Sequence, residues 1–164
     1  MKYLVFSDTH RSLLGVREVI KRCVGIDGVI FLGDNFDDSE YIAREYPELS
    51  VFAVADNCDI EAKYLAPAYQ EMILDIDGLK VLLVHGHRHE VKLGLGILEK
   101  YARSRGVDAV LFGHTHKRCD KYVDGLYIFN PGSTSQPRDG EASFGVMTVQ
   151  KGQLLFSHGS VWDK

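Results

Sequence analysis

The feature that most constrains the fold of this 164-residue chain is a set of five short apolar runs. Aspartate, histidine or asparagine follows each run within three residues. The runs lie at residues 3–6, 29–32, 51–54, 81–84 and 109–112. They are rich in β-branched and aromatic residues without polar alternation, which is typical of strands buried on both faces between helices. Because ligands bind outside the carboxyl ends of strands in open α/β sheets, these five ends are expected to bring their polar side chains together.

The second half of the chain carries three tight-turn signals. Asp-Gly pairs at 77–78 and 124–125 each separate two apolar segments, and such a pair strongly favours a two-residue β-hairpin. A Lys-Gly pair at 151–152 is expected to join segments 144–149 and 154–156 in the same way. Antiparallel hairpins added to parallel strands predict mixed sheets.

Three segments are expected to form helices. Residues 13–24 and 95–102 each carry an apolar stripe at helical spacing, and Gly106 closes the second helix. Residues 39–46 form a shorter candidate that Pro47 ends. We therefore predict a single α/β domain over residues 1–164, with two packed mixed sheets between layers of helices.

Charge and cysteine content narrow the functional classes. The net charge of −4 gives no basic surface for nucleic acid, and no apolar run approaches the roughly 18 residues of a membrane span. The first apolar run meets Asp8 too early for a signal peptide. Cys23, Cys58 and Cys119 are odd in number and widely spaced, which indicates a reducing compartment. We expect a cytoplasmic protein with no membrane partner, with homo-oligomer formation left open.

The residues that follow the five apolar runs are of the types that bind metal ions. Five of the seven histidines of the chain lie there, a placement that chance explains poorly, although each short motif alone is weak. A mononuclear site needs only about four ligands. Seven candidates with mixed oxygen and nitrogen donors therefore predict two ions bridged by one carboxylate. The candidates are Asp8, His10, Asp34, Asn57, His85, His114 and His116.

The mixture of donors also constrains the metal. Imidazole with carboxylate and amide oxygens favours Mn²⁺, Zn²⁺, Fe, Co²⁺ or Ni²⁺ over Mg²⁺ or Ca²⁺, and we expect Mn²⁺. The charges of two divalent ions exceed those of the Asp8 and Asp34 carboxylates, so the site is net positive inside an acidic protein. Such a site suits a phosphate anion.

These motifs together resemble the five sequence blocks of the calcineurin-like metallophosphoesterases. The resemblance rests on Asp8-x-His10, Gly33-Asp34, Asn57, His85-Gly86-His87 and Gly113-His114-Thr115-His116. The short length, the Ser-Asp-Thr-His opening, the Asn-Cys-Asp segment and Asn130-Pro131-Gly132-Ser133 are similar to the small prokaryotic phosphodiesterase branch. The resemblance covers residues 7 to 133.

The resemblance implies a four-layer αββα sandwich and a specific set of metal ligands. One ion would be held by Asp8, His10, Asp34 and His116. The other would be held by Asp34, Asn57, His85 and His114. Asp34 would then be the bridging carboxylate.

The third block departs from the family pattern. Asp56 stands where the family usually has glycine, at a position that could need positive φ, and it adds a carboxylate beside the metals. Cys58 replaces the histidine that often protonates the leaving group, and a thiol is a poor general acid near neutral pH. We therefore expect esters with good leaving groups to react best. The second block lacks the arginine of the protein-phosphatase branch, which argues against a Ser/Thr phosphatase of that type.

The expected activity is that of a hydrolase, most specifically a phosphodiesterase, with a small phosphate-ester substrate. A hydroxide that bridges the two ions would attack phosphorus in line, and His87 and Asn130 are candidates for supporting the ligands or contacting substrate. The cations near the blocks could hold non-reacting phosphate oxygens; they are Arg11, Arg88, Lys117, Arg118 and Arg138. Two alternatives stay open: a phosphomonoesterase with the same site, and a non-catalytic protein-binding scaffold such as the retromer subunit of this fold. Complete ligands favour the enzyme.

Overall fold

The structure is a computed structural model that describes residues 1–59, 61 and 66–163, and it contains two five-stranded mixed sheets. The first sheet has the order β10-β9-β1-β2-β3. Its strands are β1 (Lys2–Phe6), β2 (Gly28–Phe31), β3 (Ser50–Ala53), β9 (Ser143–Gln150) and β10 (Gln153–Ser160). β1, β2 and β3 are parallel, whereas β9 runs antiparallel to both β1 and β10.

The second sheet has the order β4-β5-β6-β8-β7. Its strands are β4 (Glu71–Ile76), β5 (Leu79–Val84), β6 (Ala109–Leu111), β7 (Arg118–Val123) and β8 (Leu126–Pro131). β5, β6 and β8 are parallel, and β4 and β7 are antiparallel edge strands. The predicted mixed character of both sheets is confirmed.

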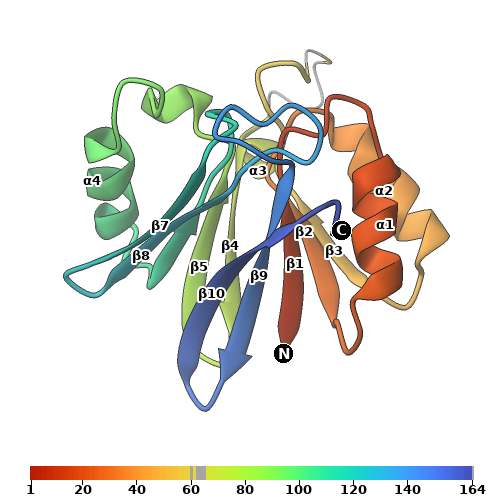
Figure 1. Cartoon of the computed structure of the whole chain (residues 1–164). Helices are drawn as coiled ribbons and strands as arrows, with labels where there is room; N and C mark the ends of the chain where they lie inside the picture. Colours follow the sequence, from red (N-terminus) through yellow and green to blue (C-terminus); the bar gives the residue numbers. More distant parts are fainter. Residues whose placement is uncertain (60, 62–65, 164) are drawn as a thin grey trace.

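Helices cover the outer faces of the two sheets (Figure 1). The helices are α1 (Leu14–Arg22), α2 (Phe36–Glu45), α3 (Pro67–Gln70), α4 (Gly96–Ser104) and the short 3₁₀ helix η2 (His87–His89). α1 and α2 lie beside the first sheet, and α4 lies beside the second. Among the helices of the described residues, none has both the length and the apolar character that crossing a membrane would need.

Three apolar clusters separate the layers. In β1, Tyr3 and Val5 belong to the cluster between the two sheets, whereas Leu4 and Phe6 belong to the cluster beneath α1 and α2. A third cluster packs the outer face of the second sheet against α4 through Leu98 and its neighbours. Each central strand is therefore buried on both faces, as its uninterrupted apolar sequence predicts. The four-layer αββα arrangement is confirmed.

The predicted turns are also confirmed, whereas the helix boundaries differ from those predicted. At each of the three hairpins, both residues of the central pair have positive φ, which two-residue turns of type I′ require. The second helix begins at Phe36 and not at residue 39, because Asp37 and Asp38 occupy the first turn, where acidic side chains are favourable. The short helix α3 was not predicted, since four residues are too few to show periodicity.

Candidate metal centre

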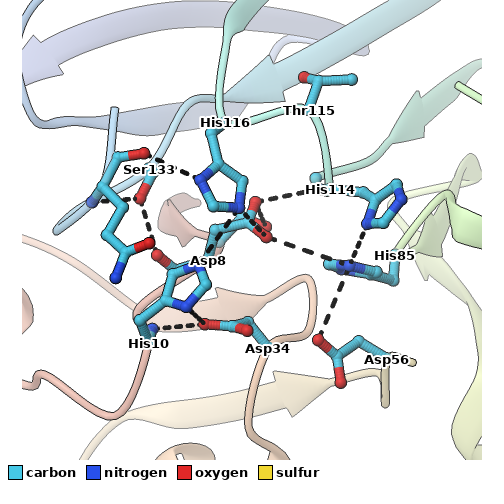
Figure 2. Close-up of polar contacts among 12 residues, drawn as sticks. Asp8, His10, Asp34, Asp56, His85, His114, Thr115, His116 and Ser133 are labelled. Carbon is cyan, nitrogen blue, oxygen red and sulfur yellow. Dashed lines mark hydrogen bonds and ion pairs between the residues drawn. The ribbon is translucent and has the colours of Figure 1, made fainter. Parts of the chain in front are cut away.

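Six of the seven predicted ligands come from loops that follow four parallel strands, and the seventh, Asn57, follows β3. Asp8 and His10 follow β1, Asp34 follows β2, His85 follows β5, and the His114–His116 segment follows β6. Two of these strands belong to each sheet, and the ends of both sheets meet at one place. Figure 2 shows Asp8 at the centre, with His10 and His116 on one side of it and His85 and His114 on the other.

The first group of ligands consists of Asp8, His10 and His116, whose candidate donor atoms all lie within 4.8 Å of one another. The Nε2 atoms of His10 and His116 are 3.2 Å apart, and His116 Nε2 is 3.4 Å from Asp8 Oδ1. His10 Nδ1 lies 3.4 Å from Asp34 Oδ2, and the His10 backbone N–H donates to the same oxygen. Asp34 thereby borders this group.

The second group surrounds His85, which is almost fully buried. Its Nε2 lies 3.1 Å from His114 Nδ1 and 4.0 Å from Asp8 Oδ1. The same Nε2 is 3.7 Å from Asp56 Oδ2. Asp34, Asp56 and Cys58 form a further set whose donor atoms lie within 4.8 Å of one another. The second group is therefore richer in carboxylate than the seven predicted ligands require.

Backbone carbonyls orient two of the imidazoles. His85 Nδ1 lies 2.6 Å from the carbonyl oxygen of Leu32, and His116 Nδ1 lies 2.8 Å from that of Gln136. A carbonyl oxygen only accepts, so both Nδ1 atoms carry the proton, and the Nε2 atom of each neutral ring presents a lone pair to the cluster. Facing lone pairs beside carboxylates are what a cation would stabilise, and histidine ligands are usually held in this manner. The donor set therefore fits divalent metal.

Asp8 is held by hydrogen bonds from two serines, to which the sequence assigned no role, and from the backbone of His114. Ser7 Oγ donates to Asp8 Oδ2 at 2.7 Å, and the His114 backbone N–H donates to the same oxygen at 3.0 Å. Ser133 Oγ donates to the Asp8 carbonyl at 2.7 Å. Both serines stand in motifs that the sequence shows, Ser-Asp-Thr-His and Asn-Pro-Gly-Ser. Ser7 bonds its neighbour in the chain, whereas Ser133 reaches Asp8 from 125 positions away.

Most of the ligands have an unusual backbone conformation. Positive φ occurs at five of the seven predicted ligands, which are Asp8, His10, Asp34, His114 and His116. For residues other than glycine this region costs about 1–3 kcal/mol each, and such residues gather at functional sites. The surrounding hydrogen bonds must hold these residues in place.

Two glycines permit the close approach of the ligand loops. A Cβ at Gly113 would collide with the side chain of Ser7 and would come within 3.0 Å of Asp8 Oδ2. Gly33 has a φ of +102°, and a Cβ there would lie 2.5 Å from His85 Nδ1. Any side chain at either position would separate the strands that bring the two groups together.

Burial and neighbouring charges shift the pKa values of several side chains in the site. Burial acts to raise the pKa of Asp8, but the hydrogen bond with His116 and the charges of His85 and His116 outweigh it, and the pKa is lowered. Burial raises the pKa of Asp34 despite the opposing effect of His10. The hydrogen bond with Asp8 raises the pKa of His116, whereas burial, the charge of His85 and the charge of Lys92 lower that of His114 to about 4.

The third sequence block is arranged differently from the others. Asn57 is exposed, and its Nδ2 lies 3.7 Å from Cys58 Sγ. The residue of this block that reaches His85 is Asp56, which is buried and has no positive φ. The structure thus brings six of the seven predicted ligands together and leaves Asn57 at the surface beside them. Burial and the charge of Asp56 raise the pKa of Cys58 to about 11, so its thiol is neutral at pH 7.

The two supporting candidates have different environments. The ring of His87 lies 5.5 Å from that of His85, and its buried Nδ1 has no hydrogen-bond partner among the residues that the structure describes. Burial and the charge of His85 lower the pKa of His87 to about 4. Asn130 is fully buried, and its Nδ2 donates to the Gly113 carbonyl at 3.0 Å and to Thr115 Oγ1 at 3.1 Å. Asn130 therefore holds the loop that carries His114 and His116, and it is too deep to contact a substrate.

Sequence and structure comparisons agree with this geometry. The sequence profile of the calcineurin-like phosphoesterase superfamily domain matches residues 1–152. A phosphodiesterase of Methanocaldococcus jannaschii is 29% identical over 166 residues, which cover 92% of this chain and 95% of that protein. The structure of a predicted phosphoesterase from Streptococcus pneumoniae has a TM-score of 0.78 at 25% identity and covers 98% of this chain and 89% of its own.

A third comparison concerns the fold alone. A variant of Vps29 from Entamoeba histolytica has a TM-score of 0.74 at 23% identity, with 98% of this chain and 99% of that chain covered. An identity this low shows a shared fold and leaves the activity to be decided by the site.

Proposed function

The chain belongs to the calcineurin-like phosphoesterase superfamily, and from that premise we propose that it is a metal-dependent phosphodiesterase with a dinuclear centre. The observation that supports this most directly is the convergence of four imidazoles and two carboxylates at the meeting ends of the two sheets. The Nε2 atoms of His10, which is exposed, and His116 face each other at 3.2 Å beside Asp8. A divalent cation at this point would accept a lone pair from each ring, and the carboxylate would balance its charge.

Two ligand sets share the bridging carboxylate in this proposal. Asp8, His10, Asp34 and His116 would hold one ion, and Asp34, Asn57, His85 and His114 would hold the other. Two divalent ions, when bound, lower the pKa of a water molecule that serves as nucleophile and neutralise charge on the phosphate. Mn²⁺ is the ion that we propose, because the donors combine imidazole nitrogen with carboxylate oxygen.

The protein's own residues position the reacting groups. The carbonyls of Leu32 and Gln136 fix the tautomers of His85 and His116, so the Nε2 atom of each neutral ring carries no proton. Cys58 remains a neutral thiol at pH 7, with its pKa raised to about 11. It therefore cannot deliver a proton to the leaving oxygen efficiently. We infer that the rate depends steeply on the pKa of the leaving group.

The preference for a diester is supported by the relatives that are named phosphodiesterases, among them the protein of Methanocaldococcus jannaschii. A phosphomonoesterase with the same ligands is the alternative activity. A protein-binding scaffold is the alternative class, since Vps29 shares the fold. The complete set of charged and imidazole donors at the site favours the enzyme over the scaffold.

The experiment that tests the proposal joins metal analysis to a substrate panel. Protein loaded with Mn²⁺ should contain about two ions per chain, as the bridged site requires. It should hydrolyse bis(p-nitrophenyl) phosphate faster than p-nitrophenyl phosphate. Full activity at a saturated stoichiometry of one ion would overturn the dinuclear centre, and a reversed preference would make the protein a monoesterase. Absence of hydrolysis with two ions bound would favour the scaffold.

A further inference from the structure

A pocket of about 400 Å³ lies directly beside the candidate metal centre. It is formed where the loop before α4 meets the segment that carries His114 and His116. Its apolar residues are Val91, Leu95, Phe112 and Cys119, and its polar and charged residues are Lys92, Thr115, Lys117, Arg118 and Arg138. The pocket thus combines an apolar floor with a strongly basic rim in a protein of net charge −4.

Two backbone connections place this pocket next to the metal ligands. Thr115 stands between His114 and His116 on one loop (Figure 2). The Arg138 backbone N–H donates to the His116 carbonyl at 2.9 Å. A molecule bound at the metals could therefore extend into the pocket.

The rim is held in place by the same residues that hold the ligand loop. Thr115 Oγ1 accepts from Asn130 Nδ2 at 3.1 Å and from the Lys117 backbone N–H at 3.2 Å. Asn130 is fully buried, so the backbone that carries Lys117 is fixed relative to His114 and His116. The backbone at Lys117 therefore has a fixed position beside the metal centre.

Most of the rim cations have no acidic partner. Arg118 forms ion pairs with Asp139 and Glu141. By contrast, Lys92, Lys117 and Arg138 form no ion pair with any residue of the described part of the chain. Three uncompensated cations beside one apolar floor favour an anionic group attached to an apolar body.

Resting on the proposed function, we propose that this pocket binds one ester arm of the diester, and that the preferred arm carries an aromatic or apolar group and a second phosphate. The floor of Leu95 and Phe112 would contact the ring. Lys92, Lys117 and Arg138 would contact the second phosphate, whose two charges match several point cations better than a single carboxylate would. The substrate class is then a phosphodiester with a phosphorylated ring-bearing arm.

The test uses two esters that differ by one group. The p-nitrophenyl ester of thymidine 5′-phosphate and its 3′-phosphorylated counterpart share the scissile bond and the leaving group. For the Mn²⁺-loaded enzyme, the second phosphate should raise kcat/KM about tenfold, the scale of two exposed charge pairs acting together. The gain should shrink as salt is added, because exposed charges are screened.

Variants assign the gain to the pocket. The double variant Lys92→Met and Lys117→Met should reduce the advantage of the second phosphate to about twofold. The matched control, Lys100→Met and Lys121→Met, removes two exposed lysines that do not line the pocket and should keep the advantage. An unchanged advantage in the pocket variant, or an equal loss in the control, would overturn the inference while leaving the phosphodiesterase intact.

A binding measurement separates this inference from the proposed function. If neither ester is hydrolysed although two ions bind, the proposed function is wrong. Calorimetry with thymidine 3′,5′-bisphosphate and thymidine 5′-phosphate still tests the pocket in that event. Tighter binding of the bisphosphate by about tenfold, lost in the Lys92→Met and Lys117→Met variant, supports the pocket. Equal affinities would overturn it.

Discussion

The first group of the candidate metal centre and the turn at residues 56–59, which borders the second group, are held in different ways. In the first group, Asp8 and His116 are fixed by bonds from distant segments, such as Ser133 to Asp8 and His116 to the Gln136 carbonyl. In the second group, the turn at 56–59 is fixed mainly by bonds within itself. The Phe36 N–H donates to Asp59 Oδ1 at 2.9 Å and ties this turn to the start of α2.

This difference bears on the two departures from the family pattern that the sequence predicts. A change in the first group would disturb contacts among β1, β6 and the loop after β8 at once. A change at 56 or 58 disturbs one short turn, which can re-form its own hydrogen bonds. Asp56 and Cys58, the two departures noted in the sequence, both lie in that turn. We expect the functional consequences of substitution to follow the same division.

The residue that joins the two groups should show the largest effect. Asp34→Asn removes the charge that would serve both ions, and it should lower kcat by more than about 10³-fold, since metal-ion catalysis supplies several kcal/mol. Circular dichroism should show a folded protein. Activity within about tenfold of the parent, or 1.4 kcal/mol of barrier, would show that Asp34 does not bridge.

Lowering the pH should weaken metal binding at the first group more than at the second. The hydrogen bond with Asp8 raises the pKa of His116, so a proton competes with the ion of the first group as pH falls through that pKa. The pKa of His114 is about 4, so this histidine is already neutral at pH 6 to 8. Mn²⁺ affinity of the first group should fall about tenfold per pH unit per displaced proton below the raised pKa.

Calorimetry from pH 8 to pH 6 would measure this, with proton release followed in buffers of different ionisation enthalpy. His116→Asn should abolish the binding step whose affinity depends more steeply on pH. Two binding steps with the same pH dependence would contradict the assignment of His116 and His114 to different ions.

The extra carboxylate of the second group should have a smaller effect. Asp56→Asn keeps an acceptor oxygen for the Cys58 and Asp59 N–H groups but removes the charge 3.7 Å from His85. Affinity for one of the two ions should fall about tenfold, within the range for residues that support metal ligands. Asn57→Ala is the comparison, because Asn57 is the proposed ligand of this block. If Asp56→Asn left both affinities unchanged, Asp56 would act only by shaping the turn.

The smallest effect is expected at Cys58. A thiol whose pKa is raised to about 11 is a poor proton donor at pH 7, so Cys58→Ser should change kcat on an activated aryl diester by less than about twofold. Stopped assays on p-nitrophenyl esters with both ions bound would measure it. A loss of about a hundredfold would make the thiol a direct participant.

Much of the fold followed from local sequence. Uninterrupted apolar runs predicted strands buried on both faces, and Asp-Gly pairs predicted hairpins with positive φ, because both signals depend on neighbouring residues alone. The convergence of six ligands also followed, since strand ends in an α/β sheet share one edge. The start of α2 was missed by three residues, and α3 was missed entirely.

Only the tertiary structure decided how the ligands are presented. The lone pair of His85 faces the cluster because the Nδ1–H group donates a hydrogen bond to the Leu32 carbonyl, and these residues are 53 positions apart. At Asp8 and His10, whose backbone is left-handed, bonds with Ser133 and Asp34 hold the main chain. Likewise, the inward direction of Asp56 and the outward direction of Asn57 depend on how one turn packs. Residue type determines which donors are available, whereas long-range hydrogen bonds and packing determine where each donor points.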